Sequence, residues 1–526
     1  MTFKEWIKRK IFKLIKVSDI NPDEEERLSL VNDKENVRET KIREYNVWYE
    51  GDGDELLNFY TKESMMDYNF EPMYSRNKRN YFWSISSTET DIKRTHSGLP
   101  RAIIDTMVNI IGKPRISSGL ELKKIDEVLE RIIKENKFYE LLRETQLPMT
   151  MVEGKGCYKI DWDLDESTVP IIEYYRANEV EYIKKRKRIV GIIFKDYYID
   201  KKENKYLITE TRHIENGNLY IDKELFRCMG EKWLKKIEFS EVEELEGTTE
   251  HLEIGNFNKF LAVPCKFYGD TVDDEDGRSV FKGRIDLFDD LDQCLSQSSN
   301  TVRKSTPKEY FNSDFLERDT KTGLPIQPKA YDRKYTMYTG ARDGNGNVAS
   351  GEPVQTTQPS LNFEQYNSES LAIVNKILIG ILSPATLGID IAKKDNAMSQ
   401  REKEKVTIFS RNTIIDCEIE ILKELFNQCL CAYEGMREDV ISTKEYAISV
   451  TFDEFADDSF ENKIRSLSVL YRERMISEDL FLEKLYGDTL SKEKREKEKN
   501  YLIAEKERMQ QNPFGNPFED FGDNEY

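Results

Sequence analysis

The stretch that most constrains this chain is residues 279–305, SVFKGRIDLFDDLDQCLSQSSNTVRKS. Ser279 can cap a helix start, because its hydroxyl can accept from a free backbone N–H. Apolar residues recur at helical spacing through the first half: Phe281, Ile285, Phe288, Leu291 and Leu295. The second half, 297–305, has Val302 as its one strongly apolar residue. A helix of about 40 Å at ~1.5 Å per residue would therefore be solvated, line a channel or pack against copies of itself over half its length.

The composition favours a large solvated surface or a surface shared with partners. Of the chain's residues, 38% are hydrophobic and 34% charged. The length of 526 residues is long for one core and predicts two to four substructures. The net charge of −19 argues against a tight grip on nucleic acid, because phosphate neutralisation by cations supplies most of that affinity. The cysteines have no CxxC spacing, so we expect reduced and mostly buried thiols made in a cytoplasm: Cys157, Cys228, Cys265, Cys294, Cys417, Cys429 and Cys431.

The N-terminus combines basic and apolar residues. No run reaches the ~18 apolar residues of a membrane span. Residues 1–17, MTFKEWIKRKIFKLIKV, place lysines between the apolar positions of one helical face, which is untypical of a signal peptide. We interpret 1–39 as a basic arm, which binds a partner or links subunits, followed by an acidic linker; a helix on a membrane surface is the alternative.

Helices are expected within 37–89, at 122–136, at 138–149 and, as the clearest buried one, after Pro100 and ending at Gly112. Residues 156–268 change to short segments rich in β-branched and aromatic residues, which predicts an antiparallel β region. Asn216-Gly217 is a type I′ hairpin signal. Further on, the pattern predicts helices at 364–382, 399–433 and 460–511, and strands at 334–339 and 448–452.

No pattern for a catalytic, cofactor or metal site emerges. The chain lacks a Walker phosphate loop, and Gly154-Lys155-Gly156 is interpreted as a plain turn. His96, His213 and His251 have no neighbour at metal-ligand spacing. The acidic turn 273–276 is expected to be solvated. Four acids crowd the long helix and are interpreted as an exposed or channel-facing stripe: Asp286, Asp289, Asp290 and Asp292.

Four stretches, in order, resemble portal proteins of tailed bacteriophages of the siphophage head–tail connector type. Residues 95–116 are similar to an early helix with a Gly-Lys-Pro turn. Residues 206–226 resemble a glutamate-x-histidine hairpin, here one residue longer between Glu210 and His213. Residues 277–316 resemble the Gly-x-Ser helix with a Leu291-Asp292 pair. Residues 377–401 resemble the following helix, stop and loop, although Asn-Ala-Met-Ser-Gln replaces the usual Thr-Ala-Thr-Glu run.

The resemblance implies an α+β portal fold assembled as a ring of twelve subunits. Its parts follow by order along the chain: wing 40–278, first stem helix 279–305, clip 306–363, second stem helix 364–382, tunnel loop 383–398, wing completion 399–455, helical crown 456–511 and an acidic disordered tail 512–526.

The implied function is a non-enzymatic channel at one capsid vertex of the virion, made in a bacterial cytoplasm, without cofactor or membrane. Implied partners are the terminase large subunit, the head–tail adaptor, capsid and scaffolding proteins, and double-stranded DNA passing without sequence-specific binding. Lys393 and Lys394 of the tunnel loop are expected to touch phosphates or to be solvated. Two alternatives stay open: another oligomeric structural or scaffold protein, and a metal-dependent nucleic-acid-processing enzyme using the acids between Asp286 and Asp292.

Overall fold

The structure is a computed structural model of the chain, and it divides into two units, Met1–Asp453 and Glu454–Tyr526. It describes residues 27–29, 33–60, 81–84, 92–118, 123–163, 166–229, 233–269, 276–305, 308–312, 317–324, 326, 335–338, 354–357, 362–389, 397–438, 444–453, 467–469, 471, 481 and 500–501. The basic arm 1–26, Lys393, Lys394, most of the expected crown and the tail 512–526 lie outside these residues. In the second unit, the rings of Tyr471 and Phe481 are 5.0 Å apart.

Helices and antiparallel sheets share the first unit, which confirms the predicted mixture of α and β structure. Its N-terminal helical layer contains α2 (Asp33–Glu50), α3 (Gly53–Asn58), the short η3 (Phe82–Ser84), α4 (Leu99–Ile111), α5 (Lys123–Glu135), α6 (Phe138–Glu140), the π-helical η4 (Leu141–Gln146) and α7 (Leu147–Glu153). The sequence indicated one helix where α6, η4 and α7 follow each other.

Helix α4 forms as expected from its sequence. Pro100 stands in its first turn, where no backbone donor is needed, and Gly112 ends it with a φ of 77°. The predicted apolar face is buried: Ile103, Ile104, Met107, Val108 and Ile111.

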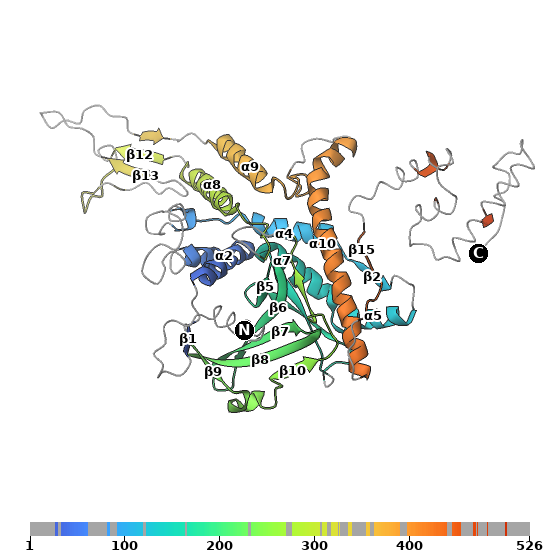
Figure 1. Cartoon of the computed structure of the whole chain (residues 1–526). Coiled ribbons are helices and arrows are strands. Elements are labelled where there is room, and N and C mark those ends of the chain that lie inside the picture. The colour runs from blue at the N-terminus through green and yellow to red at the C-terminus, as the bar shows by residue number, and fades with distance from the viewer. Residues whose placement is uncertain are drawn as a thin grey trace, which may run out of the picture. The chain divides into compact units, whose positions relative to one another are not determined.

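The β region forms two antiparallel sheets. The larger has the order β1-β9-β8-β7-β6-β5 with β10 beside β8, and the smaller has the order β11-β3-β4. The strands are β1 (Arg27–Ser29), β3 (Gly156–Asp161), β4 (Ile171–Arg176), β5 (Val180–Lys185), β6 (Arg188–Ile199), β7 (Lys205–Glu215), β8 (Asn218–Met229), β9 (Trp233–Ile237), β10 (His251–Ile254) and β11 (Ala262–Cys265). In Figure 1 the larger sheet lies on one side of the helical layer formed by α2, α4 and α7.

The β7–β8 hairpin turns at Asn216-Gly217, as predicted. Glu215 pairs with Asn218, and both turn residues have positive φ, at 53° and 85°. These are the backbone angles for which Asn and Gly are preferred in a two-residue turn.

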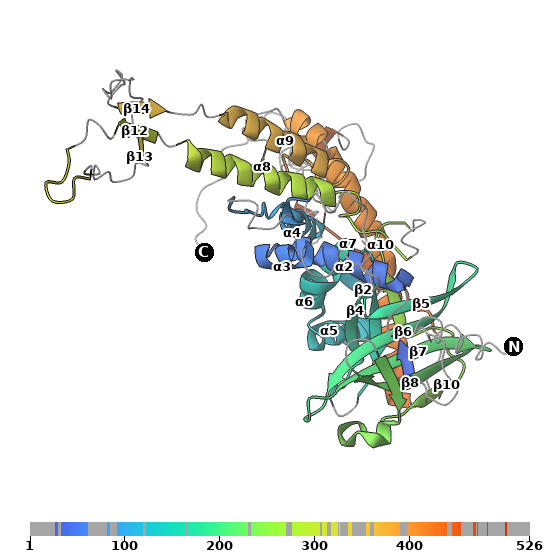
Figure 2. The same ribbon diagram turned by 90° about the vertical axis from the view of Figure 1, so that its left-hand side faces the viewer.

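The long α10 (Ala397–Glu438) contributes the aromatic and aliphatic side chains that close the core. Phe426 meets the ring of Phe138 edge-on at 5.0 Å, and Leu422 and Leu425 are fully buried. A two-stranded antiparallel sheet is formed by β2 (Arg115–Ser118) and β15 (Ile448–Thr451). It joins the segment after α4 to the segment after α10. Figure 2 shows α10 running from the α8–α9 region, described below, toward the larger sheet.

Two glycine segments cross at the junction between the β region and the next helix. A Cβ on Gly277, whose φ is 139°, would lie 2.3 Å from the carbonyl oxygen of Gly154. A Cβ on Gly154 would lie 2.7 Å from the backbone nitrogen of Ser279. Gly154 thus lies in a bend, and it must be glycine because the Gly277-Arg278-Ser279 segment approaches it closely, which the sequence did not reveal. Gly156 is already the first residue of β3, where a Cβ would meet the side chain of Tyr174.

Asp276 corrects the expectation of a solvated acidic turn. It is 7% exposed and forms ion pairs with Arg38 (3.0 Å), Lys155 (3.4 Å) and Lys184 (2.8 Å). Burial opposes its ionisation, but these three cations lower the pKa of Asp276 to about 2. The carboxylate therefore joins α2, β5 and the residue before β3; residues 273–275 lie outside the described ones.

A buried polar cluster lies under α10. Gln146 Nε2 donates to Glu418 Oε2 at 3.1 Å, and both side chains are fully buried. Burial raises the pKa of the Glu418 carboxyl to about 8. Between about pH 4.3 and 8, the Glu418 carboxyl is therefore protonated in the folded protein and ionised in the unfolded chain.

Glu418→Gln is expected to stabilise the protein above neutral pH. Since only the folded state binds the extra proton between about pH 4.3 and 8, the stability of the wild type falls as pH rises through that window. A neutral glutamine removes this dependence, so the gain should reach about 4–5 kcal/mol at pH 8 and vanish near pH 4. Urea unfolding at both pH values measures it. Glu420→Gln, on the exposed side of the same helix, is the control, and equal gains for both variants would contradict the assignment.

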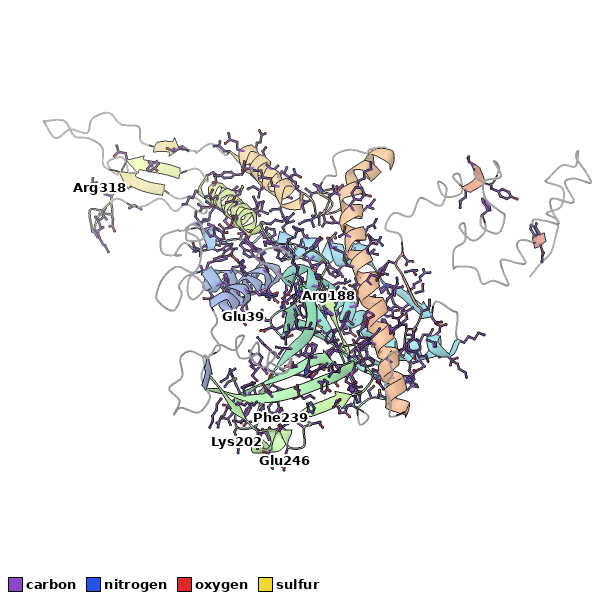
Figure 3. The ribbon with its side chains drawn as sticks, viewed as in Figure 1. Glu39, Arg188, Lys202, Phe239, Glu246 and Arg318 are labelled. Carbon is purple, nitrogen blue, oxygen red and sulfur yellow. The ribbon has the colours of Figure 1, made fainter. Side chains whose placement is uncertain are left out.

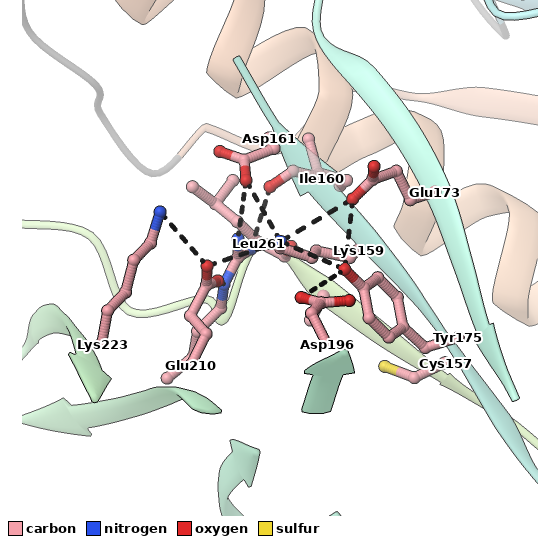
Figure 4. A network of polar contacts seen from close by, with 12 residues as sticks. Cys157, Lys159, Ile160, Asp161, Glu173, Tyr175, Asp196, Glu210, Lys223 and Leu261 are labelled. Atoms are coloured by element: carbon pink, nitrogen blue, oxygen red, sulfur yellow. Dashed lines mark hydrogen bonds and ion pairs between the residues drawn. The ribbon is translucent and has the colours of Figure 1, made fainter. Parts of the chain in front are cut away.

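A buried ion network joins the two sheets (Figure 4). Arg212, which has no exposed surface, donates from Nε to Glu210 at 2.6 Å and from Nη1 to the carbonyls of Ile160 (2.9 Å) and Leu261 (2.6 Å). Lys159 lies 3.4 Å from Glu210. Burial alone would raise the pKa of Glu210, but Arg212, Lys159 and Lys223 lower it to about 2.

His213, three residues after Glu210, lies in a different environment. It is 1% exposed, and its ring stacks on Tyr220 at 5.3 Å. The two residues of the hairpin motif therefore contribute to packing on separate sides of β7.

Candidate functional site: the α8–α9 helix pair

Helices α8 (Ile285–Lys304) and α9 (Phe363–Leu378) pack side by side along their lengths (Figures 1 and 2). Arg284 joins their ends at the core. Its guanidinium donates to the carbonyls of Ile377 (3.0 Å), in the last turn of α9, and Ile379 (2.9 Å), just past it, where the helix offers no backbone donor. The sequence offered no signal for this contact, since a single arginine before a helix is unremarkable.

Helix α8 starts six residues later than the sequence predicted. Ser279 Oγ accepts from the backbone N–H of Phe281 at 3.0 Å, but residues 280–284 form turns before the first helical residue, Ile285. The helix is thus about 30 Å long at ~1.5 Å per residue. Helix α9 likewise ends at Leu378, before the predicted 382, and α10 extends beyond 399–433 at both ends.

The first half of α8 buries charge as well as apolar groups. Asp289 Oδ2 accepts from the backbone N–H of Phe82 (2.8 Å), and its Oδ1 accepts from that of Trp83 (3.3 Å). Burial raises the pKa of Asp289 to about 7. This carboxylate therefore ties η3 to α8, although the two are about two hundred residues apart in the chain.

Asp292 is the centre of a second set of contacts. It has no exposed surface, and it accepts from Trp83 Nε1 (3.0 Å) and from the backbone N–H of Ser97 (2.8 Å). His96 Nδ1 lies 2.7 Å from its Oδ2. The segment before α4 is thereby held against α8, with the His96 ring 5.6 Å from that of Trp48.

The prediction of a four-membered exposed acidic stripe is therefore wrong for Asp289 and Asp292. Both sit on the inward face because backbone and indole N–H groups satisfy their oxygens, which offsets the cost of burying a carboxylate. Asp286 and Asp290 are exposed, and Asp286 also contacts the Tyr81 hydroxyl.

A groove of about 570 Å³ runs between the two helices. Asp290 and Glu369 place carboxylates in it, Lys376 places a cation, and Leu287 and Ile373 supply apolar surface. The remaining lining residues are mostly polar: Gln293, Cys294, Gln297, Asn362, Gln365 and Tyr366.

The outer surface of α9 exposes large apolar side chains. Phe363 is 58% exposed, Leu371 42% and Ile379, just past the helix, 69%. Val302 of α8 is 49% exposed, in line with the expectation that the second half of this helix has no apolar face to bury within its own chain. Thr301 instead hydrogen-bonds the Tyr366 hydroxyl at 3.4 Å across the pair.

A small sheet lies at the far end of the helix pair (Figure 2). Its central strand β12 (Lys308–Asn312) runs parallel to β13 (Tyr335–Tyr338) and antiparallel to β14 (Val354–Thr357). The predicted strand at 334–339 is confirmed as β13, and Leu324 and Ile326 between β12 and β13 are 67% and 52% exposed.

The loop after α9 begins on α10. Ser383 N donates to Thr407 Oγ1, and Thr386 Oγ1 also contacts Thr407 Oγ1, both at 2.9 Å. Ser383 and Thr386 thus hold the first part of the loop to Thr407, which lies within α10. Lys393 and Lys394 lie outside the described residues.

Most of the predicted free thiols are buried. Cys157, Cys265, Cys294, Cys429 and Cys431 are buried, Cys228 and Cys417 are partly exposed, and none is paired. No group of three or more metal-binding side chains converges within the described ranges, and no helix in them is long and apolar enough to cross a membrane. Neither a family model nor a curated protein matches the chain.

Proposed function

We propose that this protein is a phage portal subunit, which forms a ring of about twelve copies around a channel for double-stranded DNA at one capsid vertex. The ring would dock the terminase large subunit during packaging and the head–tail adaptor afterwards, and would contact capsid and scaffolding proteins. This role is structural rather than catalytic.

The observation that carries the proposal is the α8–α9 pair with its small terminal sheet. A single chain leaves the groove between these helices open and exposes Phe363, Leu371 and Ile379. A helix face with apolar residues and no cover within its own chain is typical of an interface with another copy. Closure of such contacts into a ring would bury these residues.

The charge distribution supports a channel through which DNA slides. Asp286 and Asp290 of α8 and Glu364 and Glu369 of α9 are exposed, against the exposed cations Arg303, Lys304 and Lys376. The pair is thus slightly negative, and the whole chain carries −19. Carboxylates that face a duplex repel its phosphates, so the DNA would not adsorb to the wall. The β12–β13–β14 sheet, on two connecting segments at the end of the pair, is suited to the clip where motor and adaptor bind.

Purified full-length protein is expected to form closed rings near twelve times 61.9 kDa. Mass photometry and negative-stain images measure the mass and the central hole. Leu371→Glu should shift the protein from rings to monomers, because a charge on the exposed face opposes the subunit contact. The melting temperature of the monomer itself should not fall, because the substitution affects only that contact.

Ile199→Glu is the matched control, since Ile199 is 57% exposed in the β region and away from the helix pair. It should leave the rings intact. Wild-type protein that stays monomeric or dimeric at every concentration would contradict the portal proposal, and rings that survive Leu371→Glu would remove the helix pair from the interface.

A further inference from the structure

The β5–β6 hairpin ends in an unusual concentration of positive charge. Residues 184–188 read Lys-Lys-Arg-Lys-Arg, the longest uninterrupted run of basic residues in a chain of net charge −19. Lys185, Arg186, Lys187 and Arg188 are all exposed. Figure 2 shows the hairpin reaching outward from the sheet, so these cations gather at a narrow tip.

The backbone at this tip is unfavourable for the residues that occupy it. Lys185 pairs with Arg188, which leaves a two-residue turn at Arg186 and Lys187, with φ of 50° and 65°. Side chains other than Asn, Asp and Gly rarely adopt this left-handed region. The β7–β8 hairpin of the same sheet uses Asn216-Gly217 for the same turn. The turn therefore has basic residues where Asn and Gly would be the preferred ones. This choice favours a role for the charge itself.

The base of the hairpin adds to this potential rather than cancelling it. Lys184 is held by Asp276, and the same carboxylate also faces Arg38 and Lys155. Lys195 at the same base faces Glu181 and Glu39, so four cations meet three carboxylates there. Arg186, Lys187 and Arg188 have no ion pair or side-chain hydrogen bond with any other residue that the structure describes.

We infer that the hairpin tip at 185–188 is a docking site for the phosphate backbone of double-stranded DNA. The tip presents cations and no apolar or aromatic side chain. Protein–protein interfaces depend on such side chains at their centre, whereas contacts to phosphates need only cations, with guanidinium groups suited to bidentate pairing. A narrow two-stranded ribbon also fits the width of a DNA groove.

This inference goes beyond the proposed channel. The helix pair, whose exposed charges nearly balance, would let DNA pass, while the hairpin, on another part of the first unit, would hold it weakly. It does not depend on ring assembly, because each chain carries a complete tip.

The test is fluorescence anisotropy of full-length protein with a labelled 30-base-pair duplex between 50 and 200 mM NaCl. With about four phosphates neutralised, wild-type affinity should fall about 100-fold over this salt range. Arg186→Asn with Lys187→Gly installs the turn residues of the neighbouring hairpin and removes two charges, so it should fold at least as stably. Its affinity at 50 mM should drop at least tenfold, and its fall with salt should shrink to about 10-fold.

The matched control is Lys201→Asn with Lys202→Gly, which removes two lysines from the turn at the other end of β6; Figure 3 labels Arg188 and Lys202 at these two ends. It should change DNA affinity less than twofold. Equal losses in both double variants, or no loss at 186–187, would overturn the inference.

Two further arms test other sources of the charge effect. Anionic phospholipid vesicles and a polyglutamate peptide replace DNA; binding to either of these without binding to DNA overturns the assignment. A triple variant, Asp273→Asn, Asp274→Asn and Glu275→Gln, tests whether these carboxylates weaken DNA binding by the tip. DNA binding seen only in that variant would mean that the chain neutralises its own tip, and would also overturn the inference.

Discussion

Asp292→Ala should destabilise the first unit by about 3–5 kcal/mol, because it leaves one buried and two half-buried polar groups without their hydrogen-bond partner. These are the indole N–H of Trp83, the backbone N–H of Ser97 and the ring of His96. The loss should also release the segment before α4 from α8. Urea unfolding followed by tryptophan fluorescence measures both effects, since Trp83 is buried beside the substituted residue.

Asp290→Ala is the matched control on the same helix. Asp290 is exposed, so its removal should change the free energy of unfolding by no more than about 0.5 kcal/mol. Similar effects of the two substitutions would show that the Asp292 contacts do not hold η3 and α4 to α8.

Arg212→Ala should have a comparable effect, about 3–5 kcal/mol, because it removes the main partner of a buried carboxylate. Glu210 would keep Lys159 and Lys223 but lose its shortest contact, and the carbonyls of Ile160 and Leu261 would lose a donor. Arg227→Ala, on the exposed surface of β8, is the control and should cost less than about 1 kcal/mol.

The pH dependence of the stability lost in Arg212→Ala identifies the Glu210–Arg212 ion pair as the source of that loss. The pKa of Glu210 is about 2 in the folded protein, so its stabilising contribution is present above about pH 4.3 and is lost as pH falls toward 2. The gap in unfolding free energy between wild type and Arg212→Ala should therefore narrow between pH 5 and pH 2.5. A gap that stays constant would assign the effect to packing alone.

The elements that could be predicted from sequence are those whose signals are local. Helix α4 has its proline, its apolar spacing and its glycine within fourteen residues, and the β7–β8 turn is specified by two residues. The β region and the second strand of the small sheet were also predicted, because alternation and turn residues are visible in short windows. The interruption of the helix between Phe138 and Glu153 by a π turn has no such local signal.

The acidic residues of α8 show where local signals end. Asp286, Asp289, Asp290 and Asp292 are alike in the sequence, and spacing alone assigned them to one stripe. Whether a carboxylate is buried depends on the donors that reach it, and here these donors come from residues 82, 83, 96 and 97. The same holds for Asp276, whose partners lie on three separate elements.

The sequence by itself determined the order of helical and β segments, the main apolar faces and the long helix with half of its surface polar, because propensity and periodicity act over a few residues. Only the tertiary structure decided which charges are buried, why Gly154 and Gly277 must be glycine, and that the run at 184–188 forms an exposed turn with positive φ. These features depend on contacts between segments far apart in the chain, and the cost of burying a charge or placing a Cβ exists only once those segments have met.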